Sequence, residues 1–210
     1  MIGPFGTSTD EQCMWRVQQD DDPAAFARLV TRWETPIRRL CERMLCDAHR
    51  GEDVAQEAFA RVFARRKDFQ PTGKFSTWLW RIAINLCHDE LRRRKRRPEH
   101  PIEDEEGETV IVLATNDPGP DAQIVSQERA AVVRRALQEM PEHLRAVLVL
   151  RHYEDLKFRE IADVLGIPEG TVKSRMFEAL NQMEQRLSAL MKGDAMDETD
   201  TGSPQSKATL

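Results

Sequence analysis

The chain has 210 residues, of which 32% are charged and 6% aromatic, and its formal net charge is -5 at pH 7. This length suits one medium domain or two small ones. No apolar run approaches the roughly 18 to 20 residues that span a membrane, and residues 1–10 lack the pattern of a secretory signal. We therefore expect a protein of the cytoplasm without membrane insertion.

The four cysteines do not have the spacing of a metal site. No CxxC pair occurs, and no histidine lies at zinc-ligand spacing from two of them. We therefore expect no metal and no cofactor. Cys41 and Cys87 fall on apolar helix faces, where a free cysteine behaves as a small hydrophobic residue. A redox-sensing role is the alternative for these thiols.

Charge is distributed unevenly along the chain. Residues 92–97 are all Lys or Arg, whereas residues 99–128 contain nine acidic residues and neither Lys nor Arg. A basic module beside an acidic linker is the arrangement that this asymmetry predicts.

Residues 22–97 are predicted to form the first domain, after an N-terminal extension over residues 1–21. Asp22 and Pro23 have the pattern of a helix start, with Asp as the N-cap and Pro at the first helical position. Apolar residues then recur at helical spacing. Pro36 is expected to kink this helix or to split it near Thr35.

Two more helices are predicted in the first domain. A polar break at residues 47–50 precedes the second, and a loop at 68–74, which holds Pro and Gly, separates it from the third. Ser76 or Thr77 is expected to cap the third helix, which runs into the basic tract and ends at Pro98.

The rest of the chain divides into a linker, a second domain and a tail. Residues 98–124 are rich in Pro, Gly, Asp and Glu and are predicted to form a flexible acidic linker. Residues 125–192 show four apolar helical patterns, and the polar residues 193–210 are expected to be disordered. The predicted fold class is all-α, with two small helical domains joined by the linker.

The second domain contains the pattern of a helix-turn-helix. A short apolar helix precedes the tight turn at residues 166–168, and a longer helix follows. With Val172 at the centre of its buried face, helical geometry places Met176, Ala179 and Leu180 inside. The residues predicted to face outward or to flank that outer face are Gly170, Lys173, Ser174, Arg175, Phe177, Glu178 and Asn181. A plain helical hairpin is the alternative, but an exposed Phe177 favours a binding surface.

The first domain carries two candidate surfaces. The third helix combines Phe75, Trp78 and Trp80 with the basic tract, a combination suited to single-stranded DNA. The alternative is that these aromatic residues belong to the core and that the cations only complement the helix dipole. On the second helix, Asp53, Gln56 and Glu57 are expected to point outward, and an ordinary solvated face is the alternative.

Three segments in the same order resemble the sigma-70 family of bacterial transcription initiation factors. EDVAQEAFARVF at 52–63 resembles the polymerase-binding helix of region 2. FSTWLWRIAINLCHDELRRRKRR at 75–97 resembles the adjoining helix that melts the promoter and reads its minus-ten element. FREIADVLGIPEGTVKSRMFEAL at 158–180 resembles the helix-turn-helix of region 4. The chain has no room for regions 1.1 and 3 of that family. An organisation with regions 2 and 4 alone resembles the extracytoplasmic-function (ECF) group.

The resemblance implies roles for matching positions. Residues 22–97 would be the region 2 domain and 125–192 the region 4 domain. Core RNA polymerase, through its beta-prime and beta subunits, and promoter DNA would be the partners, with an anti-sigma factor acting in trans. The clamp helices of beta-prime would be bound by Asp53, Gln56 and Glu57. The loop at 68–74 would capture a flipped minus-ten base, and the acidic residues 103–108 of the linker would lie near the RNA path of the polymerase.

The same resemblance supplies the DNA-binding residues. Minus-ten DNA would be bound by Phe69, Lys74, Asn85, Arg92 and Arg93. The minus-thirty-five duplex would be bound by Gly170, Thr171, Lys173, Ser174, Arg175, Phe177 and Glu178. Glu178 departs from the pattern, because many relatives have a basic residue there; a carboxylate could instead accept a hydrogen bond from a cytosine amine or face solvent.

Two other functions compete with a sigma factor. A free-standing helix-turn-helix repressor or activator would bind a palindromic operator as a dimer, and only a short seam, Met183, Leu187 and Leu190, offers a dimer surface. An enzyme acting on nucleic acid would need catalytic groups, and the chain lacks HExxH, GxxxxGK[ST] and GxSxG. Asp53 with Glu57 could hold a metal, but such a pair more often lies on a solvated face. We expect an adaptor rather than an enzyme.

Overall fold

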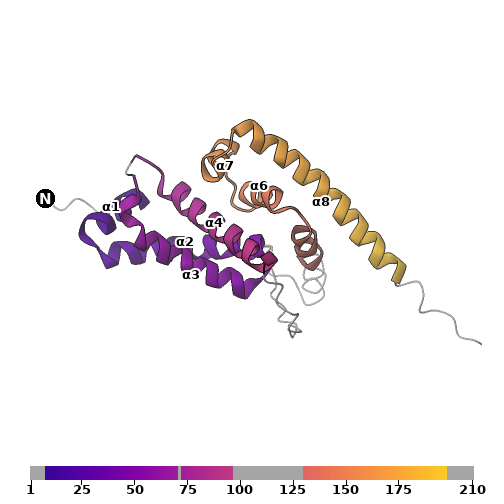
Figure 1. Cartoon of the computed structure of the whole chain (residues 1–210), viewed down its shortest axis with the longest axis horizontal. Helices are drawn as coiled ribbons and strands as arrows, with labels where there is room; N and C mark the ends of the chain where they lie inside the picture. The colour runs from indigo at the N-terminus through magenta and orange to yellow at the C-terminus, as the bar shows by residue number, and fades with distance from the viewer. Residues whose placement is uncertain (1–7, 71, 97–129, 198–210) are drawn as a thin grey trace, which may run out of the picture.

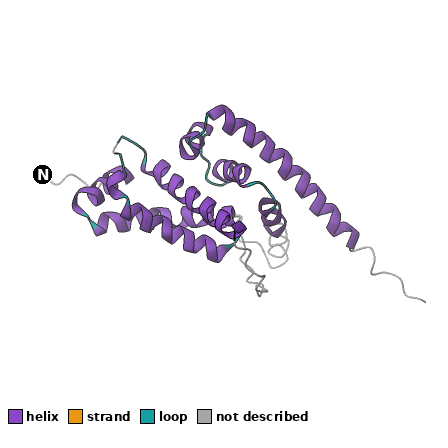
Figure 2. Ribbon diagram, in the orientation of Figure 1, coloured by secondary structure: helices purple, strands orange, loops and turns teal. Residues whose placement is uncertain are grey.

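The computed structural model describes residues 8–70, 72–96 and 130–197, with side chains described through residue 189. Within these ranges the regular elements are all helices, arranged as two bundles that lie against each other (Figures 1 and 2). The linker predicted at 98–124 lies outside the described residues, and so does the helix end predicted at Pro98.

The first bundle contains four α-helices and one short 3-10 helix. Three of the helices were expected from the sequence, whereas the first, within the N-terminal extension, was not. The elements are α1 (Asp10–Asp20), α2 (Pro23–Leu45), α3 (Ala48–Ala64), η1 (Arg66–Asp68) and α4 (Phe75–Arg96).

Helix α2 begins as the sequence predicts. The side chain of Asp22 accepts hydrogen bonds from the backbone N–H groups of Ala24 and Ala25 at 2.9 and 3.1 Å, and Pro23 follows as the first helical residue. Of the kink or split expected at Pro36, the split is wrong, because α2 continues through this residue. Pro36 cannot donate a backbone hydrogen bond to the preceding turn. Burial of Ile37 and the apolar residues after it offsets the stability that is lost in this way.

Two helix starts differ from the sequence prediction. The expected polar break at 47–50 is the first turn of α3, where the side chain of Asp47 accepts from the N–H of Arg50 at 3.0 Å. Helix α4 begins at Phe75, before the expected caps Ser76 and Thr77. The cap of α4 comes from another helix, because Oε1 of Glu11 accepts from the backbone N–H of Phe75 at 3.1 Å.

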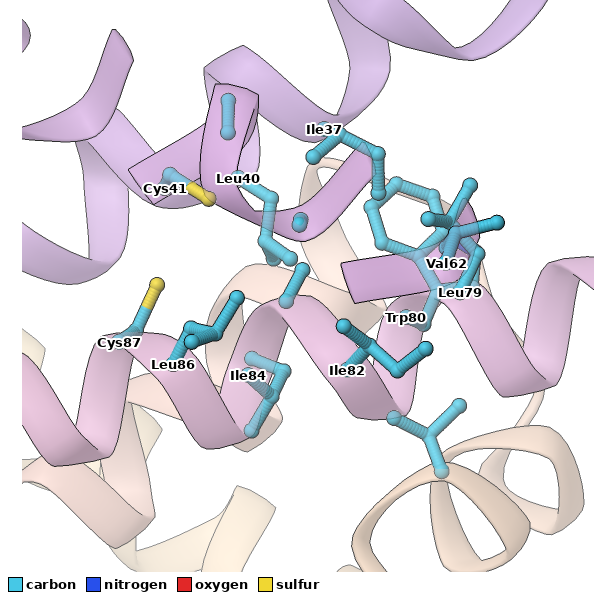
Figure 3. Packing of buried hydrophobic residues seen from close by; sticks show 14 of the residues in the cluster. Ile37, Leu40, Cys41, Val62, Leu79, Trp80, Ile82, Ile84, Leu86 and Cys87 are labelled. Atoms are coloured by element: carbon cyan, nitrogen blue, oxygen red, sulfur yellow. The ribbon is translucent and has the colours of Figure 1, made fainter. Parts of the chain in front are cut away.

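The core of the first bundle lies where α2, α3 and α4 meet, and α1 adds Cys13, Met14 and Val17 to it. Cys41 and Cys87 are fully buried free thiols that face each other across this core (Figure 3). The hydrogen bond with Cys87, together with burial, raises the pKa of the Cys41 thiol well above its usual value. Raised pKa values make thiols inert, which favours the structural interpretation over redox sensing.

The second bundle contains a helix at 130–138, followed by α6 (Glu142–His152), α7 (Phe158–Leu165) and α8 (Glu169–Asp197). Gly166 ends α7 in the left-handed conformation, with φ of 66°, which a residue without Cβ adopts at little cost. Helix α8 continues to Asp197, so the disorder expected from residue 193 is wrong for its first part. Residues 198–210 lie outside the described residues.

The two bundles share one hydrophobic core. A continuous cluster of buried side chains extends from the first bundle to Val147, Leu150, Ile161 and Val164 of the second. Helix α6 packs on α2 and α7 packs on α4 (Figure 1). Arg145, which is buried, donates to the carbonyl oxygen of Met44, so a charged side chain of the second bundle caps the end of α2.

Candidate polymerase and nucleic-acid interfaces

Helix α3 presents the acidic surface that the sequence predicts. Asp53, Gln56 and Glu57 are all exposed, because the opposite face of α3 packs Ala55 and Ala58 into the core. Glu57 pairs with Arg61 at 2.6 Å, one turn further along the helix. No described part of the second bundle covers these three side chains, so the surface is open to a partner.

The loop before α4 is anchored by aromatic residues rather than exposing them. Phe69 is only 3% exposed, and its ring packs 5.4 Å from the ring of Trp78 and 6.2 Å from that of Phe75. The prediction that the Phe69 side chain binds DNA is therefore not supported, because that ring belongs to the core. Trp80 is also a core residue, whereas Trp78 is half-buried at the edge.

One face of α4 lies under the second bundle. Lys74 pairs with Glu160 of α7, with 2.9 Å between Nζ and Oε1. This hydrogen bond raises the pKa of Lys74 and lowers that of Glu160. Arg81 donates to the carbonyl oxygens of Asp163 and Val164 at the end of α7. Arg81 of α4 and Lys74, the residue before this helix, are thus held by acceptors of the second bundle.

The basic tract at the end of α4 is paired with acidic residues through most of its described length. These pairs are Arg92 with Asp89, Arg93 with Glu90 at 2.6 Å, Arg94 with Asp47 at 3.1 Å, and Lys95 with Glu142 at 2.7 Å. The Lys95 pair joins α4 to α6. Asn85, also on α4, is exposed. Phosphate binding at the tract would require these carboxylates to be exchanged for DNA.

The first turns of α8 form an outward face. Val172 and Ala179 are fully buried, as predicted, but Leu180, which was expected inside, is 49% exposed. Its position at the edge of the helix interface leaves half of the side chain in solvent. The predicted contact residues Gly170, Lys173, Ser174, Phe177 and Glu178 are exposed, and Thr171 and Arg175 are partly exposed.

Phe177 marks this face as a binding surface. The aromatic ring is 69% exposed in the middle of polar side chains, and a large apolar side chain in such a place indicates contact with a partner. A Cβ added at Gly170 would meet no atom within 4 Å, so the backbone there is open to close approach. Lys173 pairs with a residue of its own helix, Glu169, at 2.7 Å.

Comparisons with known proteins identify both bundles. The profile of Sigma-70 region 2 matches residues 29–97, and that of Sigma-70, region 4 matches residues 130–183. The ECF RNA polymerase sigma factor SigW of Bacillus subtilis is 36% identical over 174 residues, which cover 80% of this chain and 92% of SigW. The RNA polymerase sigma-H factor of Pseudomonas aeruginosa is 36% identical over 186 residues, covering 87% and 96%.

The chain belongs to the sigma-70 family, in its ECF group.

The solved structures agree on the fold of this sigma factor. A structure of CnrH in complex with the cytosolic domain of CnrY matches with a TM-score of 0.61 and 21% identity, covering 89% of this chain and 99% of that chain. A sigma factor RpoE from Bartonella quintana, in a co-crystal structure with the anti-sigma factor NepR, matches with a TM-score of 0.57 and 20% identity, covering 78% and 96%.

As an ECF sigma factor, the chain directs core RNA polymerase to specific promoters and is an initiation factor, not an enzyme. Its partners are core polymerase and promoter DNA. Among the described residues, no group of three or more His, Cys, Asp or Glu side chains is placed to hold a metal ion. In the same residues, no helix combines the length and apolar character needed to cross a membrane.

Sequence reasoning missed the contacts that join separate segments. Helix α1, the pairing of Lys74 with Glu160 and the buried Arg43 at the domain interface were not predicted. Only α1 left a signal in the sequence. Thr9 and Gln12 have the spacing of a capping box, and the structure contains both of its hydrogen bonds.

Proposed function

We propose that three surfaces of this sigma factor divide the work of initiation. The exposed face of α3 binds the clamp helices of the beta-prime subunit through Asp53, Gln56 and Glu57. The loop at 68–74 and helix α4 bind the minus-ten strand, and the outer face of α8 binds the minus-thirty-five duplex. The observation that carries the proposal is that the α3 and α8 faces are both exposed in one structure, on different bundles.

The minus-ten assignment keeps the polar residues of the predicted set. Lys74, Asn85, Arg92 and Arg93 remain proposed DNA contacts, since each is exposed on α4 or beside its first residue. Phe69 is withdrawn as a side-chain contact because of its burial. In the proposed mechanism, unstacking a base costs a few kcal/mol. Contacts between that base and the loop that receives it offset this cost.

The minus-thirty-five assignment rests on the helix-turn-helix geometry. The N-terminal part of the second helix in this motif enters the major groove. We therefore assign base or phosphate contacts to Gly170, Thr171, Ser174 and Phe177, with the flanking cations Lys173 and Arg175. Glu178, exposed on the same face, is proposed to accept from a cytosine amine.

The cellular location and the control of the protein are proposed from its partners. We propose that it works in the cytoplasm, where core polymerase is found. Similar structures were solved with CnrY and with the anti-sigma factor NepR, and this supports the proposal that an anti-sigma factor also holds this chain in trans. Domain limits at residues 22, 97, 125 and 192 remain part of the proposal.

One experiment with two variants tests the division of work. Replacing Asp53, Gln56 and Glu57 with Ala should weaken binding to core polymerase at least tenfold, because polar contacts at the centre of an interface are lost. Replacing Lys173 and Arg175 with Ala should leave polymerase binding unchanged but reduce run-off transcription about tenfold. Binding is measured by titration of labelled sigma factor, and the helical fold is checked by circular dichroism.

Each variant serves as the control for the other. Unchanged polymerase affinity in the α3 variant would remove the assignment of that face. Unchanged promoter use in the α8 variant would remove the recognition face, and equal loss of polymerase binding in both variants would contradict the division itself.

A further inference from the structure

One row of side chains on the outer face of α8 contains hydrogen-bonding groups but no cation. Ser174, Glu178 and Gln182 follow one another at intervals of four residues, so they lie along one line of the helix. Ser174 and Glu178 are exposed, and Gln182 is partly exposed. The cations Lys173 and Arg175 lie on either side of this row rather than in it. A duplex that meets the row therefore meets polar groups at its centre and positive charge beside it.

The first two groups in this row act as hydrogen-bond acceptors. The hydroxyl of Ser174 donates its hydrogen to the carbonyl oxygen of Thr171 at 3.0 Å, which leaves the hydroxyl oxygen as an acceptor. The carboxylate of Glu178 can also only accept, because an ionised carboxylate carries no hydrogen. Both side chains therefore require a donor on the surface that they contact.

Gln182 holds the Glu178 carboxylate. The amide nitrogen Nε2 of Gln182 donates to Oε1 of Glu178 at 3.2 Å, across one turn of the helix. This bond restricts the Glu178 side chain before DNA arrives, so less conformational freedom is lost when the carboxylate binds. The bond uses one of the two carboxylate oxygens, and the other can accept from a partner. Glu178 is thus pre-arranged as an acceptor on the exposed face of α8.

The base edges in the major groove differ in what they offer to such an acceptor. Cytosine offers its N4 amine and adenine its N6 amine, whereas guanine offers the acceptors O6 and N7 and thymine the acceptor O4. A carboxylate can form a hydrogen bond with either amine, but its charge is repelled by the carbonyl oxygens of guanine and thymine. The phosphates repel it as well. The carboxylate therefore lowers the affinity for every sequence that does not present an amine to it.

We propose that Glu178 and Gln182 form an amine-selective element of the minus-thirty-five interface, which accepts cytosine or adenine at one position of one strand and rejects guanine and thymine. The inference rests on the proposed binding of the outer face of α8 to the minus-thirty-five duplex. Glu178 contacts the base, and Gln182 is a positioning residue that acts through the Glu178 carboxylate. The element lowers the general affinity for DNA and raises the selectivity at one base pair.

The test uses the full chain bound to core polymerase. The probe is a pool of duplex DNA with a randomised segment, and the readout is the base frequency at each position among the retained molecules. The wild type should favour cytosine or adenine about tenfold at one position, the factor that a good base contact provides. Glu178→Ala should reduce this preference to within about twofold. The same variant should bind a duplex of unrelated sequence up to about fivefold more tightly, the factor for one like-charge contact in water.

Gln182→Ala tests the positioning role, and Gln185→Ala is its control. Loss of one hydrogen bond between neighbouring turns weakens the hold on Glu178, so the preference should fall about twofold at the same position and at no other. Gln185 is exposed on the same helix and lies off the row, and Gln185→Ala should leave every position unchanged. An unchanged preference in Gln182→Ala, or a uniform change at all positions, would overturn the role of Gln182.

A modified base tests the hydrogen bond itself. Pyrimidin-2-one in place of the selected cytosine, or purine in place of the selected adenine, lacks the exocyclic amine. This replacement should weaken binding of the wild type about tenfold more than binding of Glu178→Ala, since the weaker base pair affects both proteins alike. Equal weakening would show that Glu178 does not accept from the amine and would overturn the proposal.

A second variant separates this proposal from the proposed role of α8. Lys173→Ala combined with Arg175→Ala removes the flanking cations and should weaken retention of the whole pool about tenfold. If it does so while Glu178→Ala keeps the base frequencies of the wild type, α8 binds the duplex but Glu178 faces solvent, and only the amine-selective element is overturned. If the cation variant retains the pool as the wild type does, the assignment of α8 is wrong, and the element is overturned with it.

Discussion

Arg43 and Glu154 form a buried ion pair between the two bundles. Nη1 of Arg43 lies 3.3 Å from Oε1 of Glu154, the side chains are only 10% and 9% exposed, and the guanidinium lies 4.2 Å over the ring of Tyr153. Burial raises the pKa of Glu154 to about 6, and the attraction of Arg43 and Arg39 only partly opposes it. Burial also lowers the pKa of Arg43. The free energy lost when this pair is removed from water therefore exceeds the free energy gained from the attraction between the two charges.

The raised pKa gives a pH dependence of known sign. Between pH 4.5 and about 6 the folded chain binds the Glu154 proton more tightly than the unfolded chain does. The stabilisation from this group is present at low pH and is lost as the pH rises through about 6. The free energy of unfolding of Glu154→Gln minus that of the wild type should therefore increase across this window, by about 2 kcal/mol at most, since one pKa unit is about 1.4 kcal/mol.

Urea denaturation at a series of pH values measures that difference. Taking the difference between the variant and the wild type cancels the contributions of other titrating groups to the free energy of unfolding. His88, whose pKa is lowered by burial, is one of these groups. A difference that stays constant or decreases between pH 4.5 and 6 would show that attraction to Arg43 outweighs desolvation.

At the scale of elements, α2 and α3 approach each other closely at Gly51. A Cβ added there would lie 2.7 Å from both the Cα and the backbone nitrogen of Glu42. Backbone atoms cannot move aside as a flexible side chain does, so the two helices would have to separate. This contact sets how α3 lies on the core and therefore where its acidic face points.

Gly51→Ala should destabilise the chain by about 1 to 3 kcal/mol, the usual cost of overpacking a core. The matched control is Gly170→Ala in α8, where an added Cβ meets nothing within 4 Å; there the better helix propensity of Ala should stabilise by up to about 1 kcal/mol. Both free energies of unfolding come from chemical denaturation. Equal effects of the two substitutions would contradict the close approach of α2 and α3.

The sequence predicts a helix boundary well where the residues that determine it lie in or next to that helix. Asp22-Pro23 and Gly166 mark boundaries that the structure contains, and the periodicity of α8 places Val172 and Ala179 inside. The start of α4 could not be predicted, because its cap is Glu11 of another helix. The burial of Phe69 likewise depends on neighbours that are brought together only by folding.

At the scale of the whole molecule, the second bundle covers part of the surface that the proposed function needs. Lys74, and with it one face of α4, is paired with α7, and Lys95 is paired with α6. The face of α3 that is proposed to bind polymerase is exposed in the same arrangement. Promoter opening should therefore require the bundles to separate, whereas polymerase binding should not.

A zero-length crosslink tests this requirement. A water-soluble carbodiimide should join Lys74 to Glu160 and Lys95 to Glu142 as amides, because the paired atoms are 2.9 and 2.7 Å apart. The crosslinked chain, identified by mass spectrometry, should bind core polymerase normally but open promoters at least tenfold more slowly. A tenfold decrease in the opening rate corresponds to about 1.4 kcal/mol. We expect at least this cost when the bundles cannot separate.

The double variant Lys74→Arg and Lys95→Arg, treated in the same way, is the control. It keeps both charges but has no amine at these positions to form an amide. Promoter opening that is as fast in the crosslinked wild type as in the treated variant would show that the bundles need not part.

The internal pairing of the basic tract has a consequence for ions in solution. When DNA takes the place of Asp47, Glu90 and Glu142 as the partner of these cations, counterions leave the phosphates, and the released carboxylates attract some of them back. Fewer ions are then released for each phosphate that is neutralised. Promoter affinity of this sigma factor should accordingly fall less steeply with ionic strength than its number of phosphate contacts alone would require.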